Sequence, residues 1–329
     1  GTLTISGSGP MKDYDTDYSP ATQKKASVKK VVIANGVTSI GNYAFWNCSN
    51  LTSIEIPSSV TSIRDDVFYN CGGLTSIEIP EGVKSIGNAA FSWCSNLTSI
   101  EIPSSVTSIG ESAFSGTPWL TDKRQENSSL VIVNGILIDG RTCSGEVTIP
   151  DGVTNIGNRA FQDCTGLTSI TIPKSVTSIG DSAFLGCSSL TDITIPGSVT
   201  SIGDSAFFEC AELTSINIPE GVTSIGKHTF FECAELTSIT IPKSVTSIEE
   251  FAFYKCTGLT SITIPKSVTS IGDSAFDSCN NLASIEIPEG VTRIEWRAFS
   301  NCTGLTSVNM PEGITSIGDF AFSECTSLT

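Results

Sequence analysis

A 23-residue period runs through most of the 329-residue chain and constrains its fold more than any other feature. Eleven of the twelve cysteines keep this step, in one series from Cys48 to Cys94 and a second from Cys164 to Cys325. Repeat units begin at twelve positions: Val28, Leu51, Leu74, Leu97, Ser144, Leu167, Leu190, Leu213, Leu236, Leu259, Leu282 and Leu305. One such unit cannot bury its apolar side alone, so the sequence predicts an elongated solenoid of stacked units.

The unit from residue 167 to 189, LTSITIPKSVTSIGDSAFLGCSS, shows the role of each column. Ile170 and Ile172 alternate with polar residues, which predicts a short strand with one buried face. Pro173 ends this strand because it has no N–H for the hydrogen-bond ladder. Val176 and Ile179 then predict a second short extended segment with inward side chains.

The second half of the unit predicts a short helical turn. Asp181 lies in a column that holds Asp or Asn in eight of twelve units, which is typical of a helix N-cap. Ala183, Phe184 and Cys187 follow and would pack inward. We therefore expect an α/β repeat solenoid with short parallel strands, short helical turns and eight buried apolar columns. Neighbouring rungs should lie roughly 4.8 Å apart.

Two regions interrupt the period and define the expected organisation. Residues 1–27 do not fit the repeat and predict an N-terminal cap, followed by repeats over 28–119. Residues 120–143 form a degenerate repeat in which Asn134-Gly135, between apolar runs, predicts a β-hairpin over 130–139 that protrudes or widens the rod. It serves either as a structural insertion or as a recognition finger. Repeats resume over 144–329, and Leu328-Thr329 read as the start of another unit, so we expect a fragment truncated at its C-terminus.

The repeat Leu-Thr-Ser-Ile-x-Ile-Pro-x-x-Val-Thr-Ser-Ile-Gly-x-x-Ala-Phe-x-x-Cys closely resembles the BspA-like leucine-rich repeats. The resemblance implies a right-handed leucine-rich-repeat superhelix in a secreted or cell-surface protein of host-associated anaerobic bacteria or protists. It also implies adhesion to host matrix proteins or to other cells, with a link to virulence. The family supplies no shared catalytic residues, and its ligands differ among members.

Composition narrows the range of partners. Acidic residues outnumber basic ones 34 to 18, for a formal charge of −16, and such a surface repels nucleic acids and anionic lipid headgroups. No run of about 18 apolar residues is present, so direct membrane insertion is not expected. We expect a monomer at the cell surface or outside the cell, although unpaired strand edges at the last rung would favour end-to-end association of a fragment.

The residue types needed for catalysis are sparse. His228 is the only histidine and replaces a small polar residue at its repeat position, which favours a surface role. No metal, phosphate or nucleophile motif appears, so we expect neither an enzyme nor a cofactor. Asp13, Asp15 and Asp17 alternate as in a calcium loop, but Tyr18 and Lys24 occupy the positions that such a loop gives to Gly and Glu. A cap without metal is therefore favoured over a calcium site.

The cysteine column predicts reduced, buried thiols. Neighbouring rungs bring the Cα atoms within the disulfide range, but the Cβ bonds should point in the same direction, into the core. A thiol also substitutes well for a small apolar residue. Cys143 lies off this column, so we expect it to be more exposed.

Two exposed columns are candidate binding sites. Glu55, Glu78 and Glu101 form an acidic strip that either meets a basic partner or a cation, or only adds solubilising charge. A second column holds aromatic residues: Trp46, Tyr69, Phe208, Phe231 and Tyr254. These rings either contact a protein or sugar ligand or pack against one another. We expect a binding module for an extracellular protein or glycan; the alternative is a passive stalk of a larger surface protein.

Overall fold

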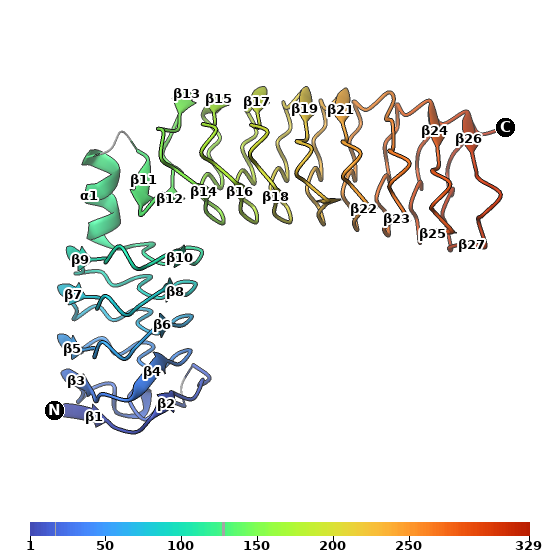
Figure 1. Ribbon diagram of the computed structural model, residues 1–329. Helices are drawn as coiled ribbons and strands as arrows, with labels where there is room; N and C mark the ends of the chain where they lie inside the picture. Colours follow the sequence, from blue (N-terminus) through green and yellow to red (C-terminus); the bar gives the residue numbers. More distant parts are fainter. Residues whose placement is uncertain (17, 127–128) are drawn as a thin grey trace. The chain divides into compact units, whose positions relative to one another are not determined.

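The computed structural model describes residues 1–16, 18–126 and 129–329, which divide into two compact units, Gly1–Ile138 and Asp139–Thr329. Both units consist of stacked rungs, most of them with two short strands, and the chain makes about twelve turns with a 23-residue period (Figure 1). The predicted repeat solenoid is confirmed. The right-handed sense of its superhelix stays a prediction.

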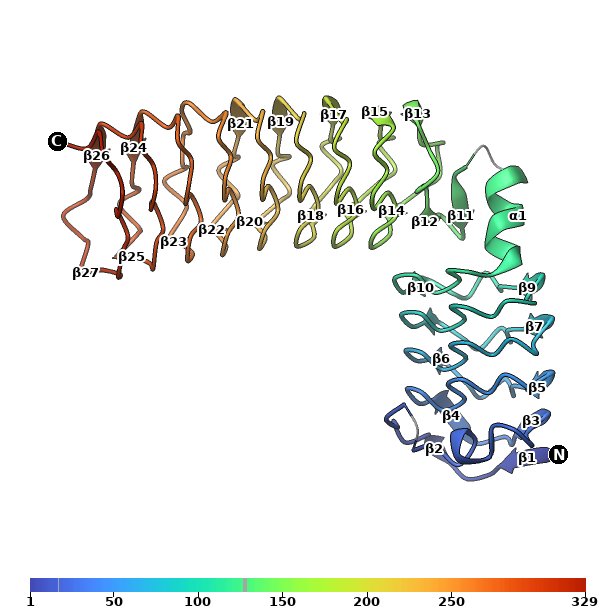
Figure 2. The same ribbon diagram turned by 180° about the vertical axis from the view of Figure 1, so that it is seen from behind.

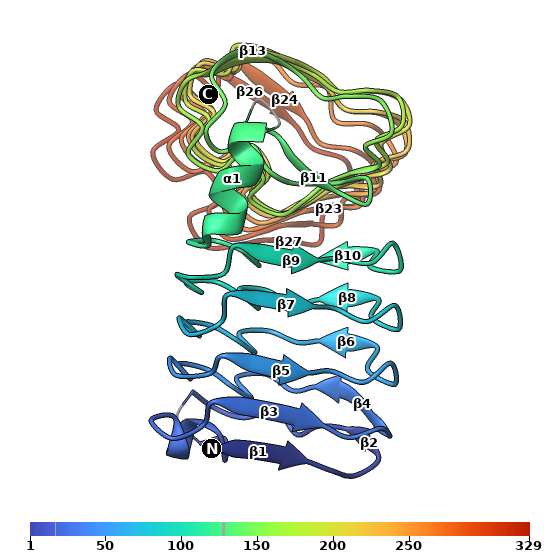
Figure 3. The same cartoon turned by 90° about the vertical axis from the view of Figure 1, so that its left-hand side faces the viewer.

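The first unit carries two columns of strands, which Figure 3 shows from the side. The first column comprises β1 (Thr2–Ile5), β3 (Lys30–Ile33), β5 (Ser53–Glu55), β7 (Ser76–Glu78) and β9 (Ser99–Glu101). The second comprises β2 (Gly9–Pro10), β4 (Val37–Ile40), β6 (Ser62–Ile63), β8 (Ser85–Ile86) and β10 (Ser108–Ile109). Paired strands are parallel, and equivalent positions of successive units face each other, as in Lys30–Ser53 and Ser62–Ser85. The register is therefore that of the sequence repeat.

The second unit repeats this arrangement, and Figure 2 shows it from behind. Its first column comprises β13 (Gly145–Thr148), β15 (Leu167–Thr171), β17 (Asp192–Thr194), β19 (Ser215–Asn217), β21 (Ser238–Thr240), β24 (Ser284–Glu286) and β26 (Ser307–Asn309). Its second comprises β14 (Asn155–Ile156), β16 (Ser178–Ile179), β18 (Ser201–Ile202), β20 (Ser224–Ile225), β22 (Ser247–Ile248), β23 (Ser270–Ile271), β25 (Arg293–Ile294) and β27 (Ser316–Ile317). Ile170 pairs with Ile193 across β15 and β17, which places identical residues in one column.

Phenylalanine rings stack along the core of each unit. Centroids of successive rings lie 5.2 to 5.7 Å apart from Phe45 to Phe114, and 5.2 to 5.5 Å apart from Phe161 to Phe322. Phe184 and Phe276 are both fully buried, as the repeat predicts. Burial of one such side chain contributes about 1.5–3 kcal/mol, so the column is a principal source of stability.

The segments expected to form short helical turns are β-turns instead. In one rung the N–H groups of Ser182, Phe184 and Gly186 donate to carbonyls of the next rung, each at 2.8 Å. The residues between them donate within their own turn, to the carbonyl three positions back. Ser182 has φ +52° and Gly186 has φ +70°, and these left-handed conformations exclude an α-helix.

The Asp/Asn column is a ladder between rungs and not a set of helix N-caps. Oδ1 of Asp181 accepts the backbone N–H of Asp204 at 3.0 Å, and Oδ1 of Asp204 accepts that of Lys227 at 2.8 Å. Asp13 begins the same ladder in the first unit, because its Oδ1 accepts the N–H of Asn42 at 2.9 Å. The preference for Asp and Asn is real, but its cause is a hydrogen bond to the next rung.

An α-helix, α1 (Pro118–Glu126), occupies part of the region predicted to be a degenerate repeat. Thr117 caps it, since its Oγ1 accepts the N–H of Leu120 at 3.2 Å. The indole of Trp119 covers the last ring of the first Phe column, with centroids 4.8 Å from Phe114. A Thr-Pro pair is a helix-start signal, so the start of α1 was predictable from the sequence.

The predicted hairpin consists of β11 (Val131–Val133) and β12 (Ile136–Asp139). Asn134 and Gly135 have φ +50° and +77°, as a type I′ turn requires. The hairpin does not protrude: Val131 and Leu137 are fully buried, and Nδ2 of Asn134 donates to the carbonyls of residues 103 and 106 at 2.8 and 2.9 Å. Its apolar side chains belong to the core, which leaves little of it available as a recognition finger.

All twelve cysteines are free thiols. Eleven are buried and Cys325 is half-buried, in agreement with the predicted ladder of reduced thiols. Cys143 was expected to be more exposed, and this was wrong: it is 7% exposed, and its carbonyl accepts the thiol of Cys164 at 2.9 Å.

The N-terminal segment that precedes the first repeat adds strands β1 and β2 and a short 3-10 helix, Thr22–Lys24. β1 pairs with β3 in the register Thr2–Lys30, so this segment joins the first strand column. The hydroxyl of Ser19, which is fully buried, donates to the carbonyl of Ala44 at 2.6 Å. Of the alternating aspartates considered for calcium, Asp17 lies outside the described residues.

Candidate ligand-binding surface

Phe208, Phe231 and Tyr254 form a continuous stack in the second unit. The centroids of Phe208 and Phe231 lie 4.4 Å apart with an interplanar angle of 4°. Those of Phe231 and Tyr254 lie 4.6 Å apart at 21°. All three side chains are half-buried. The three residues therefore cover one another and still present part of each ring to solvent.

His228 and Phe251 join this stack from a neighbouring column. Their own rings stack at 5.1 Å and 13°, and Phe251 meets Tyr254 edge-on at 5.6 Å. The ring of His228 lies 5.7 Å from that of Phe231. We refer to Phe208, His228, Phe231, Phe251 and Tyr254 as the aromatic cluster. His228 is half-buried within this surface cluster, and its packing against the neighbouring rings was not predicted from the sequence.

A comparison of residue types at one repeat position would have singled out His228 and Phe251. His228 and Phe251 occupy the column that holds Ser at positions 182, 205 and 274. This column is left-handed in every repeat, and His228 and Phe251 both have φ +54°. The backbone that presents these side chains is thus a property of the fold, while the residue type varies from rung to rung. Tyr43 and Phe320 are the other aromatic residues of this column, and His228 and Phe251 lie on successive rungs.

Ion pairs border the aromatic cluster. Nζ of Lys255 lies 2.7 Å from Oε1 of Glu232 and 5.3 Å from the centroid of Tyr254. The hydrogen bond to Glu232 raises the pKa of Lys255. Lys227 pairs with Glu250 at 3.4 Å. The cluster therefore has an apolar centre and a charged margin, an arrangement typical of protein-binding surfaces.

The two aromatic residues expected from the same column in the first unit form a separate pair. Trp46 and Tyr69 stack with centroids 6.2 Å apart at 10°, and both are half-buried. They lie on two successive rungs, and the next rung of the column holds Ser92. This pair offers a smaller apolar surface than the aromatic cluster.

The three glutamates of the acidic strip are exposed but not equivalent. Oε1 of Glu55 lies 2.5 Å from Nζ of Lys30, so this carboxylate is neutralised locally. Glu78 and Glu101 pair in register across β7 and β9, which places two like charges side by side. The uncompensated negative charge of the strip therefore comes mainly from these two residues.

A further exposed patch in the second unit was not predicted. Trp296 and Phe320 are 40% and 59% exposed, and the guanidinium of Arg297 lies 4.7 and 5.6 Å from their centroids. Trp296 occupies the Asp/Asn column, where a large ring departs from the repeat. Trp and Arg are frequent at the centres of interfaces, so this patch is a second candidate contact.

Metal ligation and membrane insertion find no support in residues 1–16, 18–126 and 129–329. No group of three or more His, Cys, Asp or Glu side chains there is arranged to hold a metal ion. Asp13, considered above for calcium, is engaged by Arg64 at 2.7 Å as well as by the N–H of Asn42. Within the same ranges, no helix has the length and apolar character needed to cross a membrane.

Comparisons with known proteins agree with this architecture. The family described as BspA type Leucine rich repeat region (6 copies) matches residues 19–135, 141–259 and 223–329. No protein with a curated description matches the sequence.

The solved structures that are similar to the chain include three leucine-rich repeat proteins of bacteria. A leucine-rich repeat protein from Bacteroides ovatus is 30% identical, with 99% of this chain and 86% of that one covered and a TM-score of 0.50. One from Eubacterium ventriosum is 27% identical, with 100% and 91% covered and a TM-score of 0.51. A leucine rich cell surface protein from Faecalibacterium prausnitzii is 34% identical, with 92% and 86% covered and a TM-score of 0.44. The chain belongs to the BspA-type leucine-rich-repeat family.

Proposed function

We propose that this chain is the binding module of a cell-surface or secreted protein, and that its aromatic cluster contacts a protein ligand. The observation that carries the proposal is the group of five half-buried rings on three successive rungs, bordered by ion pairs. A surface location is supported by the similarity to a cell surface protein of Faecalibacterium prausnitzii. Recognition, and not catalysis, is the role that a repeat scaffold with such a surface serves best.

The repeat does not need these rings in order to fold. Elsewhere in the second unit, the column of Phe231 holds Gln162, Asp277 and Ser300, and the rungs keep the same backbone. The column of His228 likewise holds Ser182 and Ser205 at nearly the same φ, +52° and +55°. An aromatic surface that the fold does not require is a reason to propose a ligand.

The stacking geometry favours a protein ligand over a glycan. Sugars bind aromatic residues through an open ring face. Both faces of Phe231 are covered, by Phe208 at 4.4 Å and Tyr254 at 4.6 Å. Phe231 therefore presents its ring edge, which carries positive partial charge and suits carbonyl oxygens and apolar side chains of a polypeptide.

A passive stalk is the second candidate, and one observation favours it. Hydroxyls of the exposed Thr column are engaged by their own scaffold: Oγ1 of Thr177 donates to the carbonyl of Thr154 at 3.2 Å, and Oγ1 of Thr200 to that of Thr177 at 3.3 Å. Much of this Thr column therefore stabilises the stacked rungs and offers few unpaired groups to a partner. Under this alternative the aromatic cluster would only pack.

The experiment is a binding screen of the whole chain against purified extracellular-matrix proteins and a glycan array. Each hit is then measured with the double variant His228→Ser/Phe251→Ser, which restores the residue that this column holds at 182 and 205. We expect at least a tenfold loss of affinity for a protein ligand, because aromatic residues dominate interface energies. Arg159→Ser, in the same column but on another rung, is the matched control and should bind as the parent does.

Two results would overturn the proposal. One is unchanged affinity in the double variant for every hit, and the other is an absence of hits in the whole panel. Either result, with the melting temperature of the double variant lowered, would assign the rings to packing and favour the stalk.

A further inference from the structure

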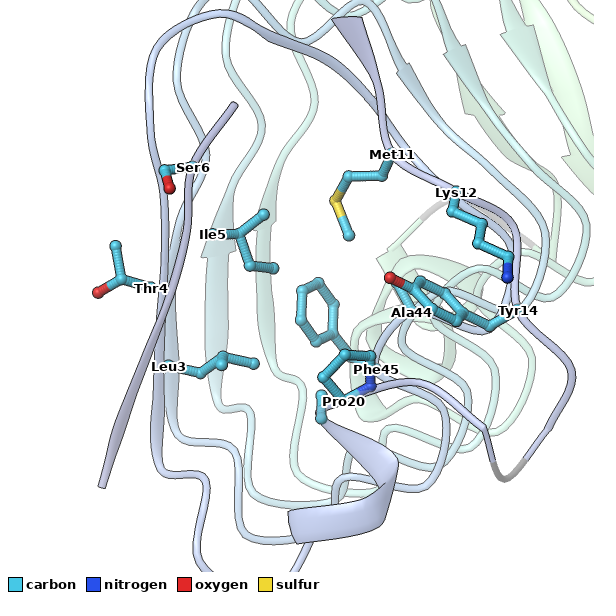
Figure 4. A pocket seen from close by; sticks show the side chains of 11 residues that line it. Leu3, Thr4, Ile5, Ser6, Met11, Lys12, Tyr14, Pro20, Ala44 and Phe45 are labelled. Carbon is cyan, nitrogen blue, oxygen red and sulfur yellow. The ribbon is translucent and has the colours of Figure 1, made fainter. Parts of the chain in front are cut away.

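The two ends of the Phe column in the first unit differ: a side chain covers one end, and a cavity lies at the other. At one end the indole of Trp119 covers Phe114, with centroids 4.8 Å apart at 56°. At the other end Phe45 is the first ring of the column, stacked on Phe68 at 5.4 Å. Beyond Phe45 lies a cavity of about 320 Å³ (Figure 4).

The walls of this cavity are mostly apolar. In Figure 4 the side chains of Leu3 and Ile5 enter from one side and that of Met11 from another, and all converge on the ring of Phe45. Leu3 and Ile5 belong to β1, so their direction is fixed by the pairing of this strand with β3. The cavity is therefore held by the sheet and does not depend on loop geometry alone.

We propose that this cavity binds a small planar aromatic molecule with one hydrogen-bonding group, of the phenol or indole class. A ring lying on Phe45 would continue the column, whose members follow one another at 5.2 to 5.7 Å in this unit. Trp119 already shows that the column accepts an aromatic ring that does not come from the repeat. Offset stacking on Phe45 is worth about 0.5–1.5 kcal/mol beyond apolar burial.

Tyr14 supplies the polar recognition. Figure 4 shows its hydroxyl directed into the cavity, opposite Ile5. This hydroxyl forms no hydrogen bond with another residue in the described part of the chain, while the backbone N–H of Tyr14 donates to the carbonyl of Asn42 at 3.0 Å and holds the residue in place. A ligand hydroxyl or ring N–H would satisfy the Tyr14 oxygen in a largely apolar site.

The volume limits the size of the ligand. Pockets for small molecules measure roughly 300–1,000 Å³, and 320 Å³ lies at the lower end of that range. One ring or two fused rings fit this space, whereas an oligosaccharide does not. The inference concerns the first unit and is independent of the aromatic cluster in the second.

The chain offers a direct spectroscopic test, because it contains only two methionines. With ¹³C-methyl methionine, Met11 reports on the cavity and Met310, 39% exposed in the second unit, is an internal control. We expect phenol and indole to shift the Met11 signal saturably, through their ring currents, and to leave Met310 unchanged. Cyclohexanol has a similar size and hydroxyl group but no aromatic ring, and it should bind at least threefold more weakly than phenol.

Two variants complete the test. Tyr14→Phe should weaken phenol binding by roughly two- to tenfold, the worth of one hydrogen bond, and leave toluene binding unchanged. Ile5→Trp fills the cavity from a strand position that tolerates aromatic residues, and it should abolish the Met11 shift while circular dichroism stays that of the parent. Absence of a saturable Met11 shift with phenol and indole, or equal phenol affinity in the parent and a folded Ile5→Trp variant, would overturn the inference.

Discussion

The thiol of Cys210 donates a hydrogen bond to the backbone carbonyl of Phe184, one rung earlier, with 3.2 Å between Sγ and O. The same carbonyl accepts the backbone N–H of Cys187 at 3.1 Å. Each such carbonyl thus serves its own rung and the next. This relationship explains why the column holds cysteine and not another small apolar residue, because alanine or valine has no donor to offer.

Replacement of Cys210 separates the hydrogen bond from the packing. We expect Cys210→Ala to lower the free energy of unfolding by about 1–2 kcal/mol, since it removes a donor and leaves a small void. Cys210→Val fills the void without restoring the donor and should cost about 1 kcal/mol or less. Urea unfolding followed by circular dichroism measures both. Equal stability of the alanine variant and the parent would show that the thiol contributes nothing.

The buried thiols also predict a dependence of stability on pH. Burial raises the pKa of Cys48 to about 11 and that of Cys94 to about 12. A raised thiol pKa means that the folded state holds its proton more tightly than the unfolded chain does. The resulting stabilisation is complete below the ordinary thiol pKa of about 8.5 and is lost as the pH rises through the folded-state values.

We therefore expect the urea midpoint to fall steadily from about pH 9 to about pH 12. A Cys48→Ala/Cys94→Ala variant should show a shallower decline of the urea midpoint over the same range. The difference between the two curves gives the part of the decline that is due to these thiols and not to other titrating groups. In the native protein at pH 8, a thiol reagent should modify Cys325 first, because it alone is half-buried. Rapid modification of Cys210 in the folded state would contradict this account.

The protein should become more stable when residues with a left-handed backbone in the turns are replaced by glycine. Ala89 has φ +48°, a conformation that costs an L-residue about 1–2 kcal/mol, and glycine adopts it freely. We expect Ala89→Gly to raise the free energy of unfolding by up to about 1 kcal/mol, after the entropic cost of glycine is included. Ala211 is half-buried like Ala89 but has no positive φ, so Ala211→Gly should instead lose about 0.5–1 kcal/mol. Thermal unfolding of the two variants should show shifts of opposite sign.

The hydrogen-bond ladder of the Asp/Asn column predicts that asparagine can replace aspartate there but that alanine cannot. Asp204 accepts the N–H of Lys227 through Oδ1, and its own N–H donates to Asp181. Asp204→Asn keeps an acceptor in the same place and removes one of two adjacent negative charges, so its stability should match or slightly exceed that of the parent. Asp204→Ala should lose about 1 kcal/mol. Equal melting temperatures for the two variants would show that this oxygen is dispensable.

The repeat predicted the core well, because a position that is apolar in every unit faces the interior on every rung. The columns of Phe184 and Val176 are buried except at the last rung, where Phe322 and Ile314 are half-buried, and this follows from a pattern in which each unit repeats an apolar residue. The short helical turns were wrong because composition does not reveal the sign of φ. Ser182 is compatible with a helix by type, but the inter-rung bond of its N–H to Asp204 requires a left-handed backbone.

The candidate surface was only partly predictable. Phe208, Phe231 and Tyr254 stand out because one column turns aromatic on three successive rungs. His228 and Phe251 lie in another column, and their approach to Phe231 depends on how the turn folds back, which no single column shows. The cavity beside Phe45 was not predictable, since the residues that wall it, such as Leu3 and Met11, lie in the segment that does not repeat.

The in-register pairing of rungs also bears on how such a gene changes over time. Within the regular repeats, strand residues pair with their equivalents in the next unit, as Ser178 does with Ser201, so internal repeats present the same two interfaces to their neighbours. Unequal recombination that inserts or deletes the codons of one whole repeat lengthens or shortens the stack by one rung and rebuilds every junction. Loss of a single codon, by contrast, misaligns the columns on either side of it. The reach of this protein can thus drift by whole rungs within a lineage while the chemistry of each rung stays intact.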